Sequence, residues 1–172
     1  MTPDEFFRKF SVKCFYHFTD LRNVSSIKER GGLLSMHEMK RRGIAVPAPG
    51  GSVASQRTDA INGMDKYVHL CFFNQNPMEY RAKEDGRIEE SKFLEVSREV
   101  ICVEGVLFTS TMSNVRGAVA VDLVRASQAL DFDAIYGKVD WSDLAQRGRV
   151  VAARKYEILV PGFVDIKYLR NI

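Results

Sequence analysis

Cysteine and histidine are scarce in this 172-residue chain, which has three of each. The cysteines are Cys14, Cys71 and Cys102, and the histidines are His17, His37 and His69. The cysteines are widely separated and lie beside apolar neighbours, which predicts free, buried thiols in a reducing compartment rather than a disulfide framework. A Cys/His metal site needs short paired spacings, which this set does not supply, so we expect no metal.

The chain also lacks a long apolar run and a strong excess of charge. No stretch approaches the roughly 18 consecutive apolar residues of a membrane span. The first five residues are acidic where a secretory signal would be basic and then apolar. We therefore expect a cytoplasmic protein with no membrane partner. The 25 Lys+Arg against 22 Asp+Glu leave a net charge of only +3, so any anion-binding site must be local.

The residues that are present are typical of a folded globular protein, with 45% hydrophobic and 27% charged side chains. The length predicts a single domain over residues 1–172. Short helices and strands mix without regular alternation, which favours an α+β fold. The expected helices are residues 4–10, 21–30, 36–42, 77–83, 121–130 and 141–147. The expected strands are residues 12–18, 68–73, 93–96, 100–103, 106–108, 156–160 and 164–169.

Two polar residues near the end of the first expected strand are candidates for ligand binding. His17 and Thr19 lie two residues apart, so a strand would place both on one face, with Phe18 turned to the core. Such a pair could hydrogen-bond a ribose or an amide. A histidine satisfied within the protein, beside a threonine that caps the next helix, is the alternative.

Two charged residues are candidates for catalysis or anion binding. Residues 43–63 are rich in Gly, Pro and Ser and predict a long loop, which is usually functional or mobile. Arg57 lies in this loop, where its forked donors would suit a phosphate or carboxylate, or would simply be solvated. Glu157 shares one face of its expected strand with Leu159, which predicts partial desolvation and a functional or paired carboxylate. An edge-strand glutamate facing water is the alternative.

A local positive stretch lies directly before Glu157. It comprises Arg147, Arg149, Arg154 and Lys155, with no acidic residue among them. A second basic cluster, residues 40–42, precedes the expected long loop. Charge runs are usually solvated faces, but these two flank the segments that hold Arg57 and Glu157, which favours an anionic partner near the same site.

Taken in order, these segments resemble the DarT family of DNA-base ADP-ribosyltransferases. The matching blocks are residues 16–27 (YHFTDLRNVSSI), 31–34 (GGLL), 56–57 (QR), 67–73 (YVHLCFF), 76–80 (NPMEY) and 156–160 (YEILV). The resemblance implies an ADP-ribosyltransferase fold with a split, mostly antiparallel β core that grips NAD in a cleft. It also implies a toxin that modifies a base of single-stranded DNA, beside a macrodomain-type antitoxin.

The resemblance also implies roles for individual residues. The cofactor-binding residues would be His17, Phe18, Thr19, Ser26, Leu34 and Arg57. The catalytic residues would be Arg57 and Glu157. The nucleic acid would contact residues 131–156, which include Arg147, Arg149, Arg154 and Lys155, with Trp141 or Tyr136 available for stacking.

The chain differs from the family pattern at His69, where members often have a proline, and in a short stretch between Arg57 and Tyr67. The acceptor base, thymine or guanine, stays open. The other functions to consider are an ADP-ribosyltransferase acting on RNA or protein, an RNA 2′-phosphotransferase, and a non-catalytic module that binds NAD or nucleic acid.

Overall fold

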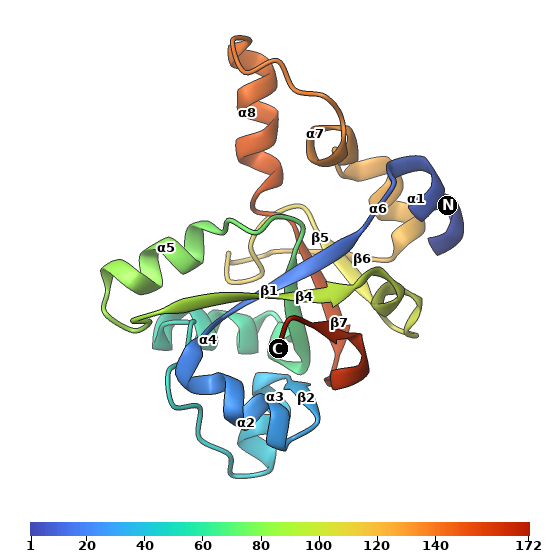
Figure 1. Ribbon diagram of the computed structural model, residues 1–172. Helices are drawn as coiled ribbons and strands as arrows, with labels where there is room; N and C mark the ends of the chain where they lie inside the picture. Colours follow the sequence, from blue (N-terminus) through green and yellow to red (C-terminus); the bar gives the residue numbers. More distant parts are fainter.

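The centre of the molecule is a seven-stranded antiparallel sheet, seen in a computed structural model that describes residues 1–172 (Figure 1). The strands are β1 (Cys14–Asp20), β2 (Gly32–Leu34), β3 (Tyr67–Cys71), β4 (Ser91–Ser97), β5 (Leu107–Thr109), β6 (Ala120–Val121), β7 (Glu157–Pro161), β8 (Phe163–Asp165) and β9 (Leu169–Arg170). The order in the large sheet is β6-β5-β7-β3-β1-β4-β9, and β2 pairs with β8 in a separate ribbon.

The large sheet is split between its two central strands. β1 pairs with β4 along its whole length, from Cys14↔Ser97 to Asp20↔Ser91. By contrast, β1 and β3 share a single register pair, Tyr16↔Cys71. The strands therefore part beyond this pair, and a cleft opens between the two halves. The expected α+β fold with a split antiparallel core is confirmed.

Eight α-helices surround the sheet. They are α1 (Pro3–Phe10), α2 (Val24–Glu29), α3 (Met36–Arg41), α4 (Val53–Ile61), α5 (Pro77–Glu84), α6 (Leu123–Ala129), α7 (Phe132–Tyr136) and α8 (Leu144–Ala153). Short 3₁₀ turns are η1 (Leu21–Asn23), η2 (Met64–Lys66), η3 (Arg98–Cys102) and η4 (Ile166–Tyr168). None of the helices combines the length and the hydrophobicity needed to cross a membrane.

One large hydrophobic core joins the sheet to the helices at one end of the molecule. Phe6 of α1 is fully buried, and its ring meets Phe132 of α7 edge-on, with centroids 4.8 Å apart. Phe72, directly after β3, packs against Phe15, Phe108 and Phe132. Such aromatic contacts add about 0.5–1.5 kcal/mol each beyond the area that they bury. This core holds the strands that carry the site residues.

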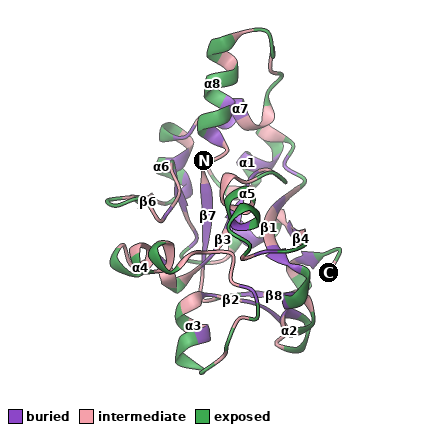
Figure 2. Cartoon of the chain, turned by 90° about the vertical axis from the view of Figure 1, so that its left-hand side faces the viewer, coloured by how far each residue is buried: buried purple, intermediate pink, exposed green.

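The arrangement separates two ends of the molecule. In Figure 1, α2, α3, α4 and β2 lie below the sheet, and α8 rises above it. Figure 2 shows that most of the outer part of α8 is exposed, while β7 runs buried through the centre. The helix α8 is anchored only at its C-terminal half, where Val150 and Ala153 pack against Ala134 of α7.

The expected long loop at residues 43–63 is wrong in its second half, which forms α4. The Ser52 hydroxyl caps this helix by accepting from the amide of Ser55. No residue of α4 is buried, so the helix has no apolar stripe and produces no periodic hydrophobic signal.

Three other expected elements are also wrong. The expected strand at residues 164–169 is divided into the end of β8, the 3₁₀ turn η4 and the start of β9. The expected strand at residues 100–103 is mostly part of η3, which buries the apolar side chains of Val100 and Ile101 within a 3₁₀ turn. The expected helix at residues 141–147 begins later, at Leu144, because Asp143 is its N-cap and accepts from the amides of Ala145 and Gln146. It then runs on to Ala153.

Candidate functional site

The main cleft lies where β1 and β3 part. Its lining brings together five of the expected cofactor-binding residues and the expected catalytic glutamate, which are His17, Phe18, Thr19, Ser26, Leu34 and Glu157. The walls of the cleft are completed by α3, α4 and residues 46–47 and 49–51 of the loop that joins these two helices. The cleft therefore collects residues from segments that are far apart in the sequence.

His17 reaches across the split in the sheet. Its Nδ1 lies 2.9 Å from the carbonyl oxygen of His69 on β3. Because a carbonyl only accepts, Nδ1 must carry the hydrogen. Burial lowers the pKa of His17, although the bond to His69 opposes this effect. A neutral His17 is left with an acceptor lone pair on Nε2, at the cleft.

Thr19 is held by a residue that sequence reasoning did not identify. Its Oγ1 accepts from the Asn23 side chain at 3.1 Å, so the Thr19 hydroxyl hydrogen stays free to donate. Asn23 also donates to the carbonyl of Ala48 at 2.8 Å and accepts from the Ala48 amide at 3.0 Å. The buried Asn23 amide thus fixes the loop against the site.

Phe18 does not turn into the main core, contrary to the expectation. Its ring is half-buried at the cleft and packs against Phe93, with centroids 6.2 Å apart. A Cβ added at Gly50 would come within 2.9 Å of the Phe18 ring. The glycine therefore lets the loop lie directly on this ring, which forms part of the cleft wall.

Glu157 begins β7, a central strand between β5 and β3, so the edge-strand alternative is excluded. The residue is 6% exposed. Its neighbour Ile158 points into the core, as the alternation predicted. Oε2 of Glu157 accepts from the amide of Ser113 at 3.0 Å, and no hydrogen bond within the chain reaches Oε1. One carboxylate oxygen is thus held and the other is free.

Sequence reasoning also missed the side chains around Glu157. His69 Nδ1 lies 3.4 Å from Oε2 of Glu157 and 2.9 Å from the hydroxyl of Ser113. Asp59 of α4 lines the same cleft, and its Oδ1 is buried without a hydrogen-bond partner. Burial raises the pKa of Asp59, while the charge on His69 opposes this effect. No local motif marks these residues, because Ser113 follows His69 by 44 positions.

Arg57 is the exception among the expected site residues. It lies on α4 rather than in a loop, it is exposed, and it does not line the cleft. Gln56 and Asp59 on either side do line it. Successive helical residues point about 100° apart, so Arg57 projects from the neighbouring face of α4, beside the cleft.

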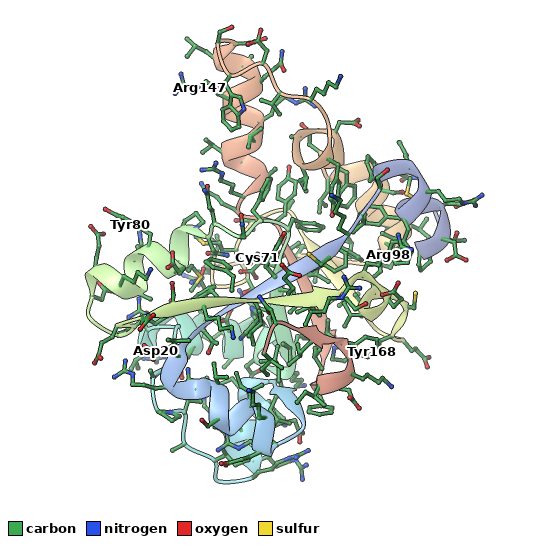
Figure 3. The ribbon with its side chains drawn as sticks, in the orientation of Figure 1. Asp20, Cys71, Tyr80, Arg98, Arg147 and Tyr168 are labelled. Carbon is green, nitrogen blue, oxygen red and sulfur yellow. The ribbon has the colours of Figure 1, made fainter.

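The expected nucleic-acid residues lie on and just after α8, outside the cleft. Figure 3 shows Arg147 on the part of α8 that projects away from the sheet, far from Cys71 at its centre. Arg149 is not free, because Asp131 binds it through Nε at 2.6 Å and Nη2 at 2.8 Å. Arg147 and Lys155 are exposed, and Arg154 is half-buried.

The two aromatic candidates for base stacking differ. Trp141 precedes α8 and is 57% exposed, so its ring is accessible. The ring of Tyr136 packs against Phe6, Phe10 and Phe72. Tyr136 therefore belongs to the aromatic core and does not present a stacking surface.

The three cysteines are free thiols, as expected, but only Cys71 is buried, because Cys14 is half-buried and Cys102 is exposed. Cys71 lies in the cleft wall, where burial raises the pKa of its thiol to about 12. It therefore stays a thiol and does not act as a nucleophile near neutral pH. No group of three or more His, Cys, Asp and Glu side chains is arranged to hold a metal ion.

Comparison with solved structures gives relatives of the same fold. A DarT from Thermus sp. 2.9, in complex with ADP-ribosylated single-stranded DNA, has a TM-score of 0.67 and 19% identity, covering 92% of this chain and 79% of that one. The same protein in complex with NAD+ has a TM-score of 0.59 and 21% identity, covering 92% and 80%. Thermosipho africanus DarTG, in complex with ADP-ribose, has a TM-score of 0.63 and 18% identity, covering 91% and 42%.

Comparison of the sequence with family profiles gives the classification. No functionally curated protein matches the chain. The profile described as "ssDNA thymidine ADP-ribosyltransferase, DarT" matches residues 16–172, which is most of the chain. The chain therefore belongs to the DarT family of single-stranded DNA thymidine ADP-ribosyltransferases, as the resemblance predicted.

Proposed function

We propose that this protein transfers ADP-ribose from NAD to a thymine base of single-stranded DNA, with release of nicotinamide. The observation that carries the proposal is the placement of Glu157, a buried carboxylate with one free oxygen, in the cleft that also holds His17 and Thr19. The family description favours thymine over guanine, the base that the sequence left open.

Glu157 would act on the ribose whose bond to nicotinamide is cleaved. Cleavage of this bond in NAD builds positive charge on the anomeric carbon. The free oxygen, Oε1, would accept a hydrogen bond from a ribose hydroxyl, and the carboxylate would stabilise the cationic transition state. Because Ser113 already holds Oε2, the group is oriented before the substrate binds, which lowers the cost of reorganisation.

The side chains of β1 would hold the nicotinamide end. His17 offers an acceptor at Nε2 and Thr19 offers a donor, so together they match a carboxamide or a ribose, which carries both kinds of group. Phe18, Ser26 and Leu34 would contact the remainder of the dinucleotide along the cleft wall. A ligand of this kind needs hydrogen-bond partners that the protein leaves free, and Nε2 of His17 and the Thr19 hydroxyl hydrogen are two such groups.

Arg57 would act from the rim of the cleft. A guanidinium keeps its proton at neutral pH and is a poor base. We therefore assign Arg57 to stabilising negative charge on the pyrophosphate or on the thymine ring as its nitrogen loses a proton. Its exposed position on α4 would let the side chain swing over the cleft when both substrates are present.

The acceptor would be unpaired DNA, because a ring nitrogen inside a duplex cannot be reached. Arg147, Arg154 and Lys155 would track the phosphates along α8, and Trp141 offers an exposed ring for stacking. Such a reaction needs NAD and DNA in one compartment, and we place it in the cytoplasm. The whole chain, residues 1–172, would form one transferase domain acting as a toxin, with a macrodomain protein that removes the modification as its partner.

The experiment is mass spectrometry of short single-stranded oligonucleotides, each with one test base, after incubation with the protein and NAD. We expect a mass increase of one ADP-ribose on thymine, with equal release of nicotinamide. Modification of guanine alone would contradict the proposed acceptor. Parallel incubations with RNA and with protein substrates test the remaining acceptors. NAD that binds without any release of nicotinamide would indicate a binding module instead.

A further inference from the structure

His69 occupies a position in which both ring nitrogens face oxygen atoms. Nε2 lies 2.9 Å from the carbonyl oxygen of Met64, and a carbonyl oxygen can only accept. Nδ1 lies 2.9 Å from the Ser113 hydroxyl and 3.4 Å from Oε2 of Glu157. The Ser113 hydroxyl can donate or accept, whereas the Met64 carbonyl and the Glu157 carboxylate only accept. A ring that carries hydrogen on both nitrogens suits both acceptors, and this is the protonated, positively charged form.

The charges around His69 favour the same form. Glu157 faces its ring from β7, and Asp59 lies across the cleft on α4. The other acidic, cysteine, histidine and tyrosine side chains here are the neutral His17, Tyr67 and Cys71 on the same strand as His69, and Asp65, which lies 3.8 Å from Nδ1 of His37. Among the residues that line the cleft, Arg30 is the only lysine or arginine, and it has no ion pair with these carboxylates.

The balance of these effects is in favour of the charged ring. Burial by itself would lower the pKa of His69, but the Glu157 carboxylate 3.4 Å away and the charge of Asp59 raise the pKa to about 9. Ser113 connects His69 to Glu157, because its hydroxyl lies 2.9 Å from Nδ1 of His69 and its amide donates to Oε2 of Glu157 at 3.0 Å.

We propose that His69 is a positioning residue that carries a positive charge beside Glu157, in the same cleft as Asp59. A positive charge at this position favours the ionised form of a nearby carboxylate. The imidazolium also draws Oε2 toward itself and Ser113, which leaves Oε1 facing the cleft. This proposal deepens the proposed function, and it rests on Glu157 being the catalytic carboxylate.

Without a nearby cation, two carboxylates that line the same cleft are less readily ionised together. Like charges in a shared, partly buried site favour retention of one proton between them. A proton on Glu157 would remove the negative charge that the transition state needs.

The first test measures the ring itself and needs neither NAD nor DNA. With three histidines in the chain, the Cε1–H proton signals are few, and the signal missing from His69→Gln identifies His69. We expect His69 to titrate near pH 9 in the unmodified protein and well below that value in Glu157→Gln. Titration of His69 below pH 7 with Glu157 intact would overturn the proposal, even if the protein transfers ADP-ribose.

The second test compares the pH dependence of nicotinamide release. A cation adjacent to a carboxylate typically shifts its titration by about 1–3 pH units. We expect the pH at which activity falls on the acid side to be about 1–2 units higher in His69→Gln than in the unmodified protein. At alkaline pH the activity of this variant should approach that of the unmodified protein. The matched control, His37→Gln, replaces the exposed histidine outside the cleft and keeps the original profile. A loss of activity equal at every pH would indicate a merely structural role and would overturn the proposal.

Discussion

Asn23 and Ala48 exchange two hydrogen bonds that join η1 to the loop over the cleft. The Asn23 side chain donates to the Ala48 carbonyl at 2.8 Å and accepts from its amide at 3.0 Å. The same side chain donates to Thr19 at 3.1 Å. One buried amide therefore couples the loop to a residue proposed to bind NAD, although neither composition nor spacing draws attention to it.

Replacing Asn23 by alanine tests this coupling. The change leaves buried polar groups of Ala48 unsatisfied, which typically costs about 1–3 kcal/mol, and it frees the loop from Thr19. We expect lower unfolding stability and an increased KM for NAD, with a smaller effect on kcat. Urea denaturation and initial-rate kinetics measure the two effects. The matched control is Asn171→Ala, which removes a donated bond to the Phe93 carbonyl and an accepted bond from the Glu95 amide outside the cleft. An unchanged KM in Asn23→Ala would contradict the coupling.

Glu157→Gln tests the proposed catalytic carboxylate. The substitution keeps the shape and an oxygen that can accept from Ser113, but it removes the charge that stabilises the transition state. Loss of one such electrostatic group typically costs about 10²–10³-fold in kcat. We expect a decrease of this size in nicotinamide release, measured together with NAD binding by calorimetry.

Glu157→Asp is the matched comparison, because it keeps the charge and withdraws it from the cleft. A misplacement of about 1 Å can cost roughly 10²-fold, so this variant should also lose most activity. Near-full activity in either variant, with the fold intact, would show that Glu157 is not the catalytic group.

Arg57→Lys separates charge from geometry. Lysine keeps the positive charge but loses the planar, forked donors. We expect the activity of Arg57→Lys to be reduced at least about tenfold, because one lost charge-assisted hydrogen bond costs about 1.5–3 kcal/mol. The activity of Arg57→Ala should be lower still. Base-modification assays with saturating NAD measure the effect. Activity of the lysine variant equal to that of the original protein would mean that only charge matters at this position.

The site residues that could be predicted from the sequence are those marked by a pattern within their own segment. Glu157 could be identified because the alternation in β7 places it opposite the core residues Ile158 and Val160, and that pattern is local. Arg57 could be named by resemblance, but its helix could not be predicted, because α4 buries no residue. The fold class followed from the many short elements, whose apolar patterns are also local.

The surroundings of Glu157 could not be predicted for a different reason. Ser113 and His69 meet through contacts that span 44 residues, and each is unremarkable in its own segment. Asn23 bonds Ala48 across 25 residues. Such contacts depend on the packing of the sheet, which composition and spacing do not determine. Ion pairs between distant residues cannot be predicted for the same reason, and the pairing of Arg149 with Asp131 is an example.

Asp20 gives a prediction for stability against pH. Its buried carboxylate accepts from Arg22 and from the amide of Glu89, and the Arg22 guanidinium holds the pKa of Asp20 well below its usual range. Because the folded state binds this proton less readily than the unfolded state, the stabilisation is present above the usual pKa of about 3.9 and is lost as the pH falls.

We therefore expect Asp20→Asn to be less stable than the original protein at neutral pH, by about 1–3 kcal/mol. The difference should narrow as the pH is lowered toward about 3. Urea denaturation at several pH values measures it, with the exposed Asp133→Asn as control. A constant difference across this range would contradict the assignment.

The basic residues on and just after α8 give a prediction for DNA binding. Removal of one phosphate-binding side chain should lower the slope of log K against log salt by about 1. Arg147→Ala and Lys155→Ala remove exposed, unpaired charges, so each should weaken binding of single-stranded DNA equally across sequences. Arg149 is already bound to Asp131, so Arg149→Ala should change the slope less than either. Asp131→Asn releases Arg149 and should strengthen binding at low salt. Fluorescence anisotropy with a labelled oligonucleotide over a salt series measures all four, and an unchanged slope in the Arg147 and Lys155 variants would exclude α8 from the DNA path.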